Sequence, residues 1–250
     1  MSLDRTERLR ELGLLPAWRL RAPGPGAQAT EAPDDEADGA VPEAIDRPLA
    51  QVAVPRSAAS SPCGLDWPQL EAAIRACTCC DLHQSRTQGV PGVGDRNADW
   101  LIVGEAPGAE EDRQGEPFVG QAGKLLDAML AAIGQRRGRN VYIANVLKSR
   151  PPGNRDPRPE EVAACLPYLE RQIDLIQPKI IIALGRFAAQ SLLLTDTSIT
   201  RLRGKVHEYR GVPLVVTYHP AYLLRNPADK AKVWEDLVLA RSTLAGVVSG

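Results

Sequence analysis

Residues 100–108 read WLIVGEAPG, a short apolar run that ends in a glycine-rich turn. Such a run predicts a buried strand, because a strand covered on both faces carries apolar side chains on both sides. Three later runs have the same character, at residues 141–144, 179–184 and 214–217, and a helical pattern follows each of the four. Strands that alternate with helices predict an α/β fold, a three-layer α/β/α sandwich around a central four-stranded parallel sheet.

The composition divides the 250 residues into three parts. Residues 1–21 carry leucines at helical spacing and predict a short helical segment. Residues 22–65, rich in proline, alanine and acidic residues, predict a disordered linker. Residues 66–250 hold the alternating pattern and predict one globular domain. With a net charge of −1, no apolar run of membrane-spanning length and no secretory signal, we expect a cytoplasmic monomer with no membrane contact.

Three of the five cysteines lie together in the stretch Cys77-Thr-Cys-Cys80. An odd, clustered set of cysteines indicates metal chemistry in a reducing compartment and not a disulfide framework. Thiolates are the preferred ligands of structural zinc and of iron–sulfur clusters.

Polar residues follow the predicted strands at their carboxyl ends, where parallel α/β folds place their active sites. Asn145 ends the second strand, and His219 follows the fourth. The loop after Asn145 carries four cations that suit phosphate contact: Lys148, Arg150, Arg155 and Arg158. Each signal alone also fits an ordinary loop, so its meaning depends on the combination.

Together, five motifs resemble those of the type 4 (iron–sulfur) uracil-DNA glycosylases, and they cover most of the predicted domain. They read CTCCDLH (77–83), GEAPGAEED (104–112), GEPFVGQAGKLL (115–126), NVLKSRPPGNR (145–155) and HPAYLLR (219–225). The resemblance implies a DNA repair enzyme that hydrolyses the N-glycosidic bond of uracil in DNA and leaves an abasic site. Such an enzyme first flips the target nucleotide out of the base stack.

The resemblance also implies roles for individual residues. Phe118 is expected to stack on uracil, Asn145 to hydrogen-bond its pairing edge, and Glu111 to exclude the methyl group of thymine. His219 is expected to stabilise the negative charge on the departing base. The other expected site residues are Gly104, Glu105 and Ala106 in the pocket, with Glu105 also catalytic, Asn154 beside the attacking water, and Lys148, Arg150, Arg155, Leu224 and Arg225 on the DNA.

The resemblance further implies a structural [4Fe–4S] cluster. The four positions that match its ligands are Cys77, Cys80, Cys165 and Ser149. The last is a serine in place of the expected cysteine, which leaves three outcomes open. A serine oxygen or water ligates one iron of a weakened cluster, Cys79 or Cys63 supplies the missing thiolate, or zinc or no metal takes its place. We expect a cluster with a labile fourth iron.

Three other functions share part of this sequence pattern. The superfamily variant that traps abasic DNA covalently has a basic insertion ending in histidine after the second strand, and residues 150–158 contain no histidine. A nucleotide-binding α/β protein is disfavoured because no phosphate-loop or dinucleotide fingerprint is present. A non-catalytic DNA-binding or replication-associated module stays open, with residues 1–21 docking on a replication or repair protein. The combination of Phe118, Asn145 and His219 favours the active enzyme.

Overall fold

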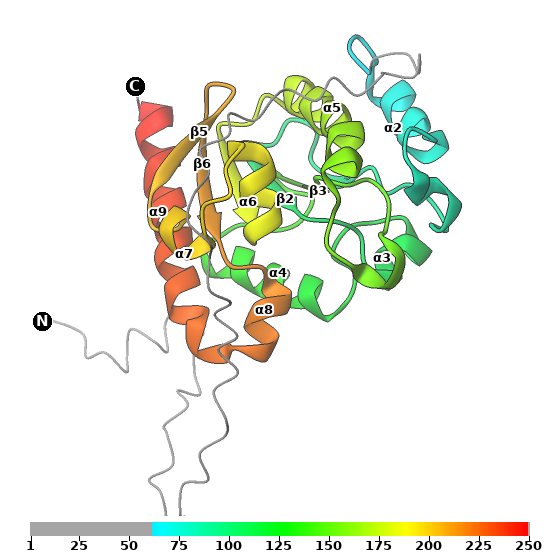
Figure 1. The fold of residues 1–250 in the computed structure, drawn as a ribbon. Helices are drawn as coiled ribbons and strands as arrows, with labels where there is room; N and C mark the ends of the chain where they lie inside the picture. Colours follow the sequence, from blue (N-terminus) through cyan, green and yellow to red (C-terminus); the bar gives the residue numbers. More distant parts are fainter. Residues whose placement is uncertain (1–61, 250) are drawn as a thin grey trace, which may run out of the picture. The chain divides into compact units, whose positions relative to one another are not determined.

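The four apolar runs form the middle of one sheet (Figure 1). The computed structural model describes residues 62–249, so the segment predicted at 1–21 and most of the predicted linker lie outside the described residues. Four parallel strands lie side by side in the order β3-β2-β4-β6. Their bounds are Trp100–Gly104 for β2, Val141–Asn145 for β3, Ile180–Leu184 for β4 and Val212–Thr217 for β6. These four strands are the ones that the sequence predicts.

The sheet has six strands, so the predicted number of four is corrected. β1 (Val93–Gly94) pairs antiparallel with β3, and β5 (Val206–Tyr209) pairs antiparallel with β6. Both additions are edge strands. β1 is only two residues long, and β5 alternates exposed and half-buried residues. Neither strand carries the continuous apolar run that marks a strand buried on both faces.

Helices cover both faces of the sheet, as the three-layer prediction requires (Figure 1). Alternate side chains of β2 point to opposite faces. Trp100 and Ile102 pack in the same core as α4 and α9, whereas Leu101 and Val103 pack with α5 and α6. The bounds of these helices are Gln121–Ala132 for α4, Pro159–Ile176 for α5, Arg186–Leu193 for α6 and Lys230–Ser249 for α9.

Helix α2 (Trp67–Ala76) leads into the cysteine-rich stretch. Asp66 caps it: Asp66 Oδ1 accepts the backbone N–H of Gln69, and the Gln69 side chain accepts the N–H of Asp66. The remaining elements are short: α3 (Ala109–Gln114), α7 (Ile199–Leu202), α8 (Pro220–Arg225), and the single-turn 3₁₀ helices η1 (Asp81–Gln84), η2 (Pro152–Asn154) and η3 (Pro227–Asp229). Within residues 62–249, no helix is long and apolar enough to cross a membrane.

Candidate active site

The carboxyl ends of the central strands bring the main predicted pocket residues together. Gly104 ends β2 and pairs in register with Asn145, the last residue of β3. A methyl group on Gly104 would lie 2.3 Å from Asn145 Oδ1 and 2.6 Å from Cζ of Phe118. The Phe118 ring lies 5.5 Å from the His219 ring, centre to centre, at an angle of 32°. The absence of a side chain at Gly104 therefore lets Asn145 and Phe118 come close to the end of β2.

Asn145 presents a hydrogen-bond acceptor that has no partner within the described residues. Its side chain is buried. Within residues 62–249, two buried side-chain nitrogen or oxygen atoms have no hydrogen bond, and they are Asn145 Oδ1 and Trp100 Nε1. An unpaired buried polar atom costs about 1–3 kcal/mol. A ligand with an N–H group at this point would recover that free energy, so Asn145 is a candidate ligand contact.

Phe118 lies in the left-handed backbone region, with a φ of 55°. This conformation costs an L-residue about 1–3 kcal/mol and persists only where the surroundings enforce it. The two N–H groups that follow Phe118 donate to Glu111 Oε1 over 3.0 and 3.2 Å. The Phe118 carbonyl packs against Gly123, where a methyl group would lie 1.7 Å from the carbonyl oxygen. The turn therefore holds a buried aromatic ring beside the pocket.

His219 caps the amino end of α8 and carries a neutral imidazole. Its Nδ1 accepts the backbone N–H of Ala221 at 3.1 Å, so the ring proton sits on Nε2. Burial lowers the pKa of His219 to about 4, and the positive charge of Arg225 acts in the same direction. Gly185 allows the close approach of β4, because a methyl group there would lie 3.0 Å from His219 Cβ. At neutral pH His219 therefore offers an uncharged N–H donor.

Glu105, the residue after Gly104, is the carboxyl group whose protonation changes near neutrality. Burial raises the pKa of Glu105 to about 7, and the negative charge of Asp156 adds to the shift. A carboxyl group with this pKa suits proton transfer at neutral pH. Ala106, the next residue, packs against the apolar cluster that contains Cys165. The pocket and the cysteine-rich region therefore share a border.

The end of α8 carries two of the residues that are predicted to contact DNA. Leu224 is 48% exposed and Arg225 is exposed beside it, a few residues from His219. Leu223 is buried in the core. Of the two adjacent leucines, only Leu224 is therefore available to enter a DNA groove.

Lys148 is buried, which corrects its predicted role as a DNA contact. Its side chain is 1% exposed, and Nζ donates to the Asn145 carbonyl and to Gln172 Oε1, each at 2.7 Å. Burial lowers the pKa of Lys148 to about 7. An ammonium group that is enclosed and hydrogen-bonded in this way is not available to a phosphate. Lys148 instead supports the backbone that carries Asn145.

The rest of the loop after β3 is engaged in contacts of its own. Arg155 pairs with buried Glu161, although its side chain stays 32% exposed. Arg150 Nε donates to Asn154 Oδ1 over 2.7 Å, and Asn154 is exposed. Among the described residues, no hydrogen bond joins Asn154 to Asn145 or to the other pocket residues. The structure therefore does not connect Asn154, expected beside the attacking water, with the pocket.

The cysteines expected to bind a cluster lie near one another but do not form a complete ligand set. The thiols of Cys80 and Cys165 are hydrogen-bonded, and this contact lowers the pKa of Cys80 to about 6. The backbone N–H of Lys148 donates to Cys165 Sγ at 3.4 Å, and that of Cys79 donates to Cys77 Sγ at 3.5 Å. Such N–H bonds to sulfur are typical of iron–sulfur sites. Within residues 62–249, no three His, Cys, Asp or Glu side chains form a group that could hold a metal ion.

Ser149 is held by a cation. It is buried, and its Oγ accepts a hydrogen bond from Arg86 Nη1 at 2.6 Å. Arg86 Nη2 donates to the carbonyls of Arg75 and Cys77. The N–H donors to Cys77 and Cys165 suit thiolate ligands, whereas a hydroxyl that faces a guanidinium does not suit the fourth ligand position. Cys77, Cys80 and Cys165 therefore remain the candidate ligands, without Ser149.

Three residues that shape the pocket were missed by sequence reasoning: Gly123, Gly185 and Arg137. The glycines matter because a backbone or side chain comes close to them, and the sequence alone does not reveal such an approach. Arg137 donates to the carbonyls of Pro117 and Phe118 over 2.9 and 2.8 Å. It stands in the basic run Arg-Arg-Gly-Arg139, which looks like a solvated loop, so no sequence signal would have found it.

Comparison with known proteins identifies the family of the chain. A family model for the uracil DNA glycosylase superfamily matches residues 91–238. A type-4 uracil-DNA glycosylase of Archaeoglobus fulgidus is 54% identical over 162 residues, which cover 62% of this chain and 81% of the relative. Two relatives come from Pyrobaculum aerophilum: a type-4 uracil-DNA glycosylase is 46% identical over 183 residues (70% of this chain, 93% of the relative), and a type-5 enzyme is 33% identical over 153 residues (55% and 67%). The chain belongs to the uracil DNA glycosylase superfamily and, within it, to the type-4 group.

Proposed function

We propose that this protein hydrolyses the N-glycosidic bond of uracil in DNA and leaves an abasic site. The observation that carries the proposal is the unpartnered, buried Asn145 Oδ1 beside the Phe118 ring. Uracil presents an N–H group at N3, flanked by two carbonyl oxygens, and an amide side chain matches this edge with one acceptor and one donor. A flat base between Phe118 and the strand ends would fill the space above Gly104.

Glu111 supports the selectivity against thymine. Its carboxylate is fixed by the two N–H groups that follow Phe118, so it cannot move aside for a larger base. A pocket that merely lacks contact with a methyl group discriminates by only about 1–3 kcal/mol. A fixed charged group placed toward C5 of the base would exclude the methyl group more strongly.

Bond cleavage places the electron pair of the C1′–N1 bond on the base, and water adds to C1′ of the sugar. The neutral His219 Nε2–H would donate to a carbonyl oxygen of the departing uracil anion, where negative charge grows in the transition state. The attacking water loses one proton as the new C–O bond forms. Glu105, whose pKa of about 7 leaves much of it ionised at neutral pH, is the carboxylate we assign to accept that proton.

Leu224 and Arg225 are the proposed contacts with the displaced strand. An exposed leucine next to the pocket can fill the gap that the flipped base leaves, because apolar side chains inserted between base steps support a distorted duplex. The adjacent guanidinium would hold a phosphate. Arg150 and Arg155 stay further proposed phosphate contacts.

We also infer a structural [4Fe–4S] cluster held by Cys77, Cys80 and Cys165. When bound, it would tie the end of α2 to α5 and to the loop after β3. The Ser149 hydroxyl accepts a hydrogen bond from Arg86, so water and not the serine oxygen would be the ligand of the fourth iron. That iron is expected to be labile.

The decisive experiment is uracil excision by the full chain. A labelled duplex with one uracil is incubated with the protein and then treated with alkali, which breaks the strand at abasic sites. Breakage with uracil but not with thymine is expected. Binding of the uracil duplex without breakage would contradict the proposal and favour the non-catalytic DNA-binding module.

A further inference from the structure

The strained turn at Phe118 is held from two opposite directions. On one side Glu111 accepts the two N–H groups that follow the residue. On the other side Arg137 donates to the two carbonyls that flank it, with Nη1 at 2.9 Å from the Pro117 oxygen and Nη2 at 2.8 Å from the Phe118 oxygen. The left-handed φ of Phe118 is therefore fixed by side chains that bind the N–H groups after it and the carbonyls on either side of its Cα atom.

Arg137 is itself held in place. Its Nε donates to Asp127 Oδ1 on α4 at 3.0 Å, and its side chain is 23% exposed. A guanidinium is planar and rigid, so three bonds from one side chain set the distance between α4 and the turn. A lysine ammonium would not reproduce this fork.

The Phe118 carbonyl has little room to move. It lies between Arg137 and the backbone of α4, where a methyl group on Gly123 would sit 1.7 Å from its oxygen. A displacement of this carbonyl would displace the adjoining Cα atom and, with it, the Phe118 ring. The contacts of Arg137 with the turn therefore control where the ring stands relative to Asn145.

We propose that Arg137 is a positioning residue that sets the stacking orientation of Phe118 against the flipped base. The proposal rests on the proposed uracil-excising function. Arg137 acts through the Phe118 turn, because its hydrogen bonds go to Asp127 and to the two carbonyls.

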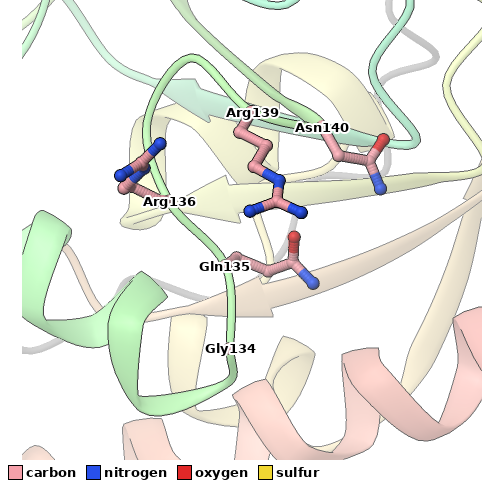
Figure 2. Close-up of a pocket in the computed structure, with 5 residues that line it drawn as sticks. All are labelled: Gly134, Gln135, Arg136, Arg139 and Asn140. Atoms are coloured by element: carbon pink, nitrogen blue, oxygen red, sulfur yellow. The ribbon is translucent and has the colours of Figure 1, made fainter.

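The same loop offers matched controls. Arg136 and Arg139 are exposed and line a cavity of about 500 Å³ with Gly134, Gln135 and Asn140 (Figure 2). Among the described residues, neither side chain has a hydrogen bond to the turn at Phe118. Arg136→Ala and Arg139→Ala remove the same charge from the same loop and leave the turn intact.

The test separates base binding from DNA binding without requiring cleavage. Fluorescence polarisation measures the affinity of the full chain for two duplexes, one with 2′-fluoro-2′-deoxyuridine, which resists hydrolysis, and one with a tetrahydrofuran abasic site. Arg137→Ala is expected to weaken binding to the uracil analogue about tenfold, since it removes charged hydrogen bonds, and to leave abasic-site binding within about twofold. Arg137→Lys is expected to recover part of the loss, and the two control variants to match the wild type.

An equal loss with both duplexes, or no loss with either, would overturn the proposal. If Arg137→Ala fails to fold, as judged by thermal unfolding, Arg137→Lys and Asp127→Asn carry the test, with the same selective but smaller loss expected. Wild-type excision is measured in parallel. Absence of excision by the wild type counts against the proposed function, whereas wild-type excision with a non-selective Arg137 effect counts against this inference alone.

Discussion

The base pocket and the cysteine-rich region share a border at Ala106, yet they differ in how their polar groups are satisfied. In the pocket, the buried Asn145 Oδ1 has no partner among the described residues. In the cysteine-rich region, Ser149 already accepts from Arg86, and Cys165 already accepts from the Lys148 N–H. A buried acceptor without a partner is available to a ligand. Groups that already have hydrogen-bond partners in the protein depend less on a ligand. The difference predicts that the pocket is sensitive to small changes and that the fourth cluster position is not.

The largest expected effect comes from His219. His219→Ala removes the Nε2–H donor from the departing base and is expected to lower the single-turnover rate of uracil excision about 10²–10³-fold, the loss typical of one such donor. His207→Ala is the matched control, because His207 lies on β5 and its Nε2 is hydrogen-bonded to the Leu202 carbonyl. If the rate of His219→Ala is close to that of the control, His219 does not stabilise the departing base.

Gly104 gives the next effect. Gly104→Ala places a methyl group 2.3 Å from Asn145 Oδ1 and 2.6 Å from Phe118 Cζ, so one or both must move. A displacement of about 1 Å at a reacting site costs roughly 10²-fold in rate, and we expect that loss in uracil excision. Gly246→Ala is the control, since an added methyl group there meets nothing within 4 Å. Thermal unfolding shows whether Gly104→Ala remains folded, and full activity in the folded variant would contradict the pocket described here.

Proton transfer gives an intermediate effect that depends on pH. The pKa of Glu105 is raised to about 7, so the carboxylate form is lost as the pH falls through 7. We expect the single-turnover rate to fall about tenfold per pH unit below 7 and to level off above it. Burial also lowers the pKa of Lys148 to about 7, so either group could produce this pH profile. The variant Glu105→Gln distinguishes the two. If the rate of this variant is slow and independent of pH, Glu105 causes the pH profile. If the profile is unchanged, another group causes it.

The sequence predicts the four central strands and the main pocket residues because both follow from local signals. Apolar runs identify the strands, and the motifs at their ends identify Phe118, Asn145 and His219. The predicted DNA contact of Lys148 is wrong, because a lysine in a loop with three arginines gives no sign of burial, and only tertiary packing against Gln172 supplies it. The positive φ of Phe118 and its clamp by Arg137 also arise from contacts between distant segments.

The smallest expected effect on activity tests the cysteine-rich region. Ser149→Cys adds a fourth thiol in place of a hydroxyl that Arg86 now holds. Thiolates are the preferred ligands of iron–sulfur clusters, so the variant is expected to keep close to four irons per chain after mild oxidation, whereas the wild type loses one. Iron and sulfide analysis, absorbance near 400 nm and electron paramagnetic resonance of a three-iron cluster measure this. Uracil excision should change less than about threefold, because Lys148 already links Cys165 to Asn145 through the hydrogen bonds of its backbone N–H and its Nζ. A strong gain in activity would show that the pocket depends on the fourth ligand. A colourless wild-type protein that contains zinc would contradict the proposed iron–sulfur cluster.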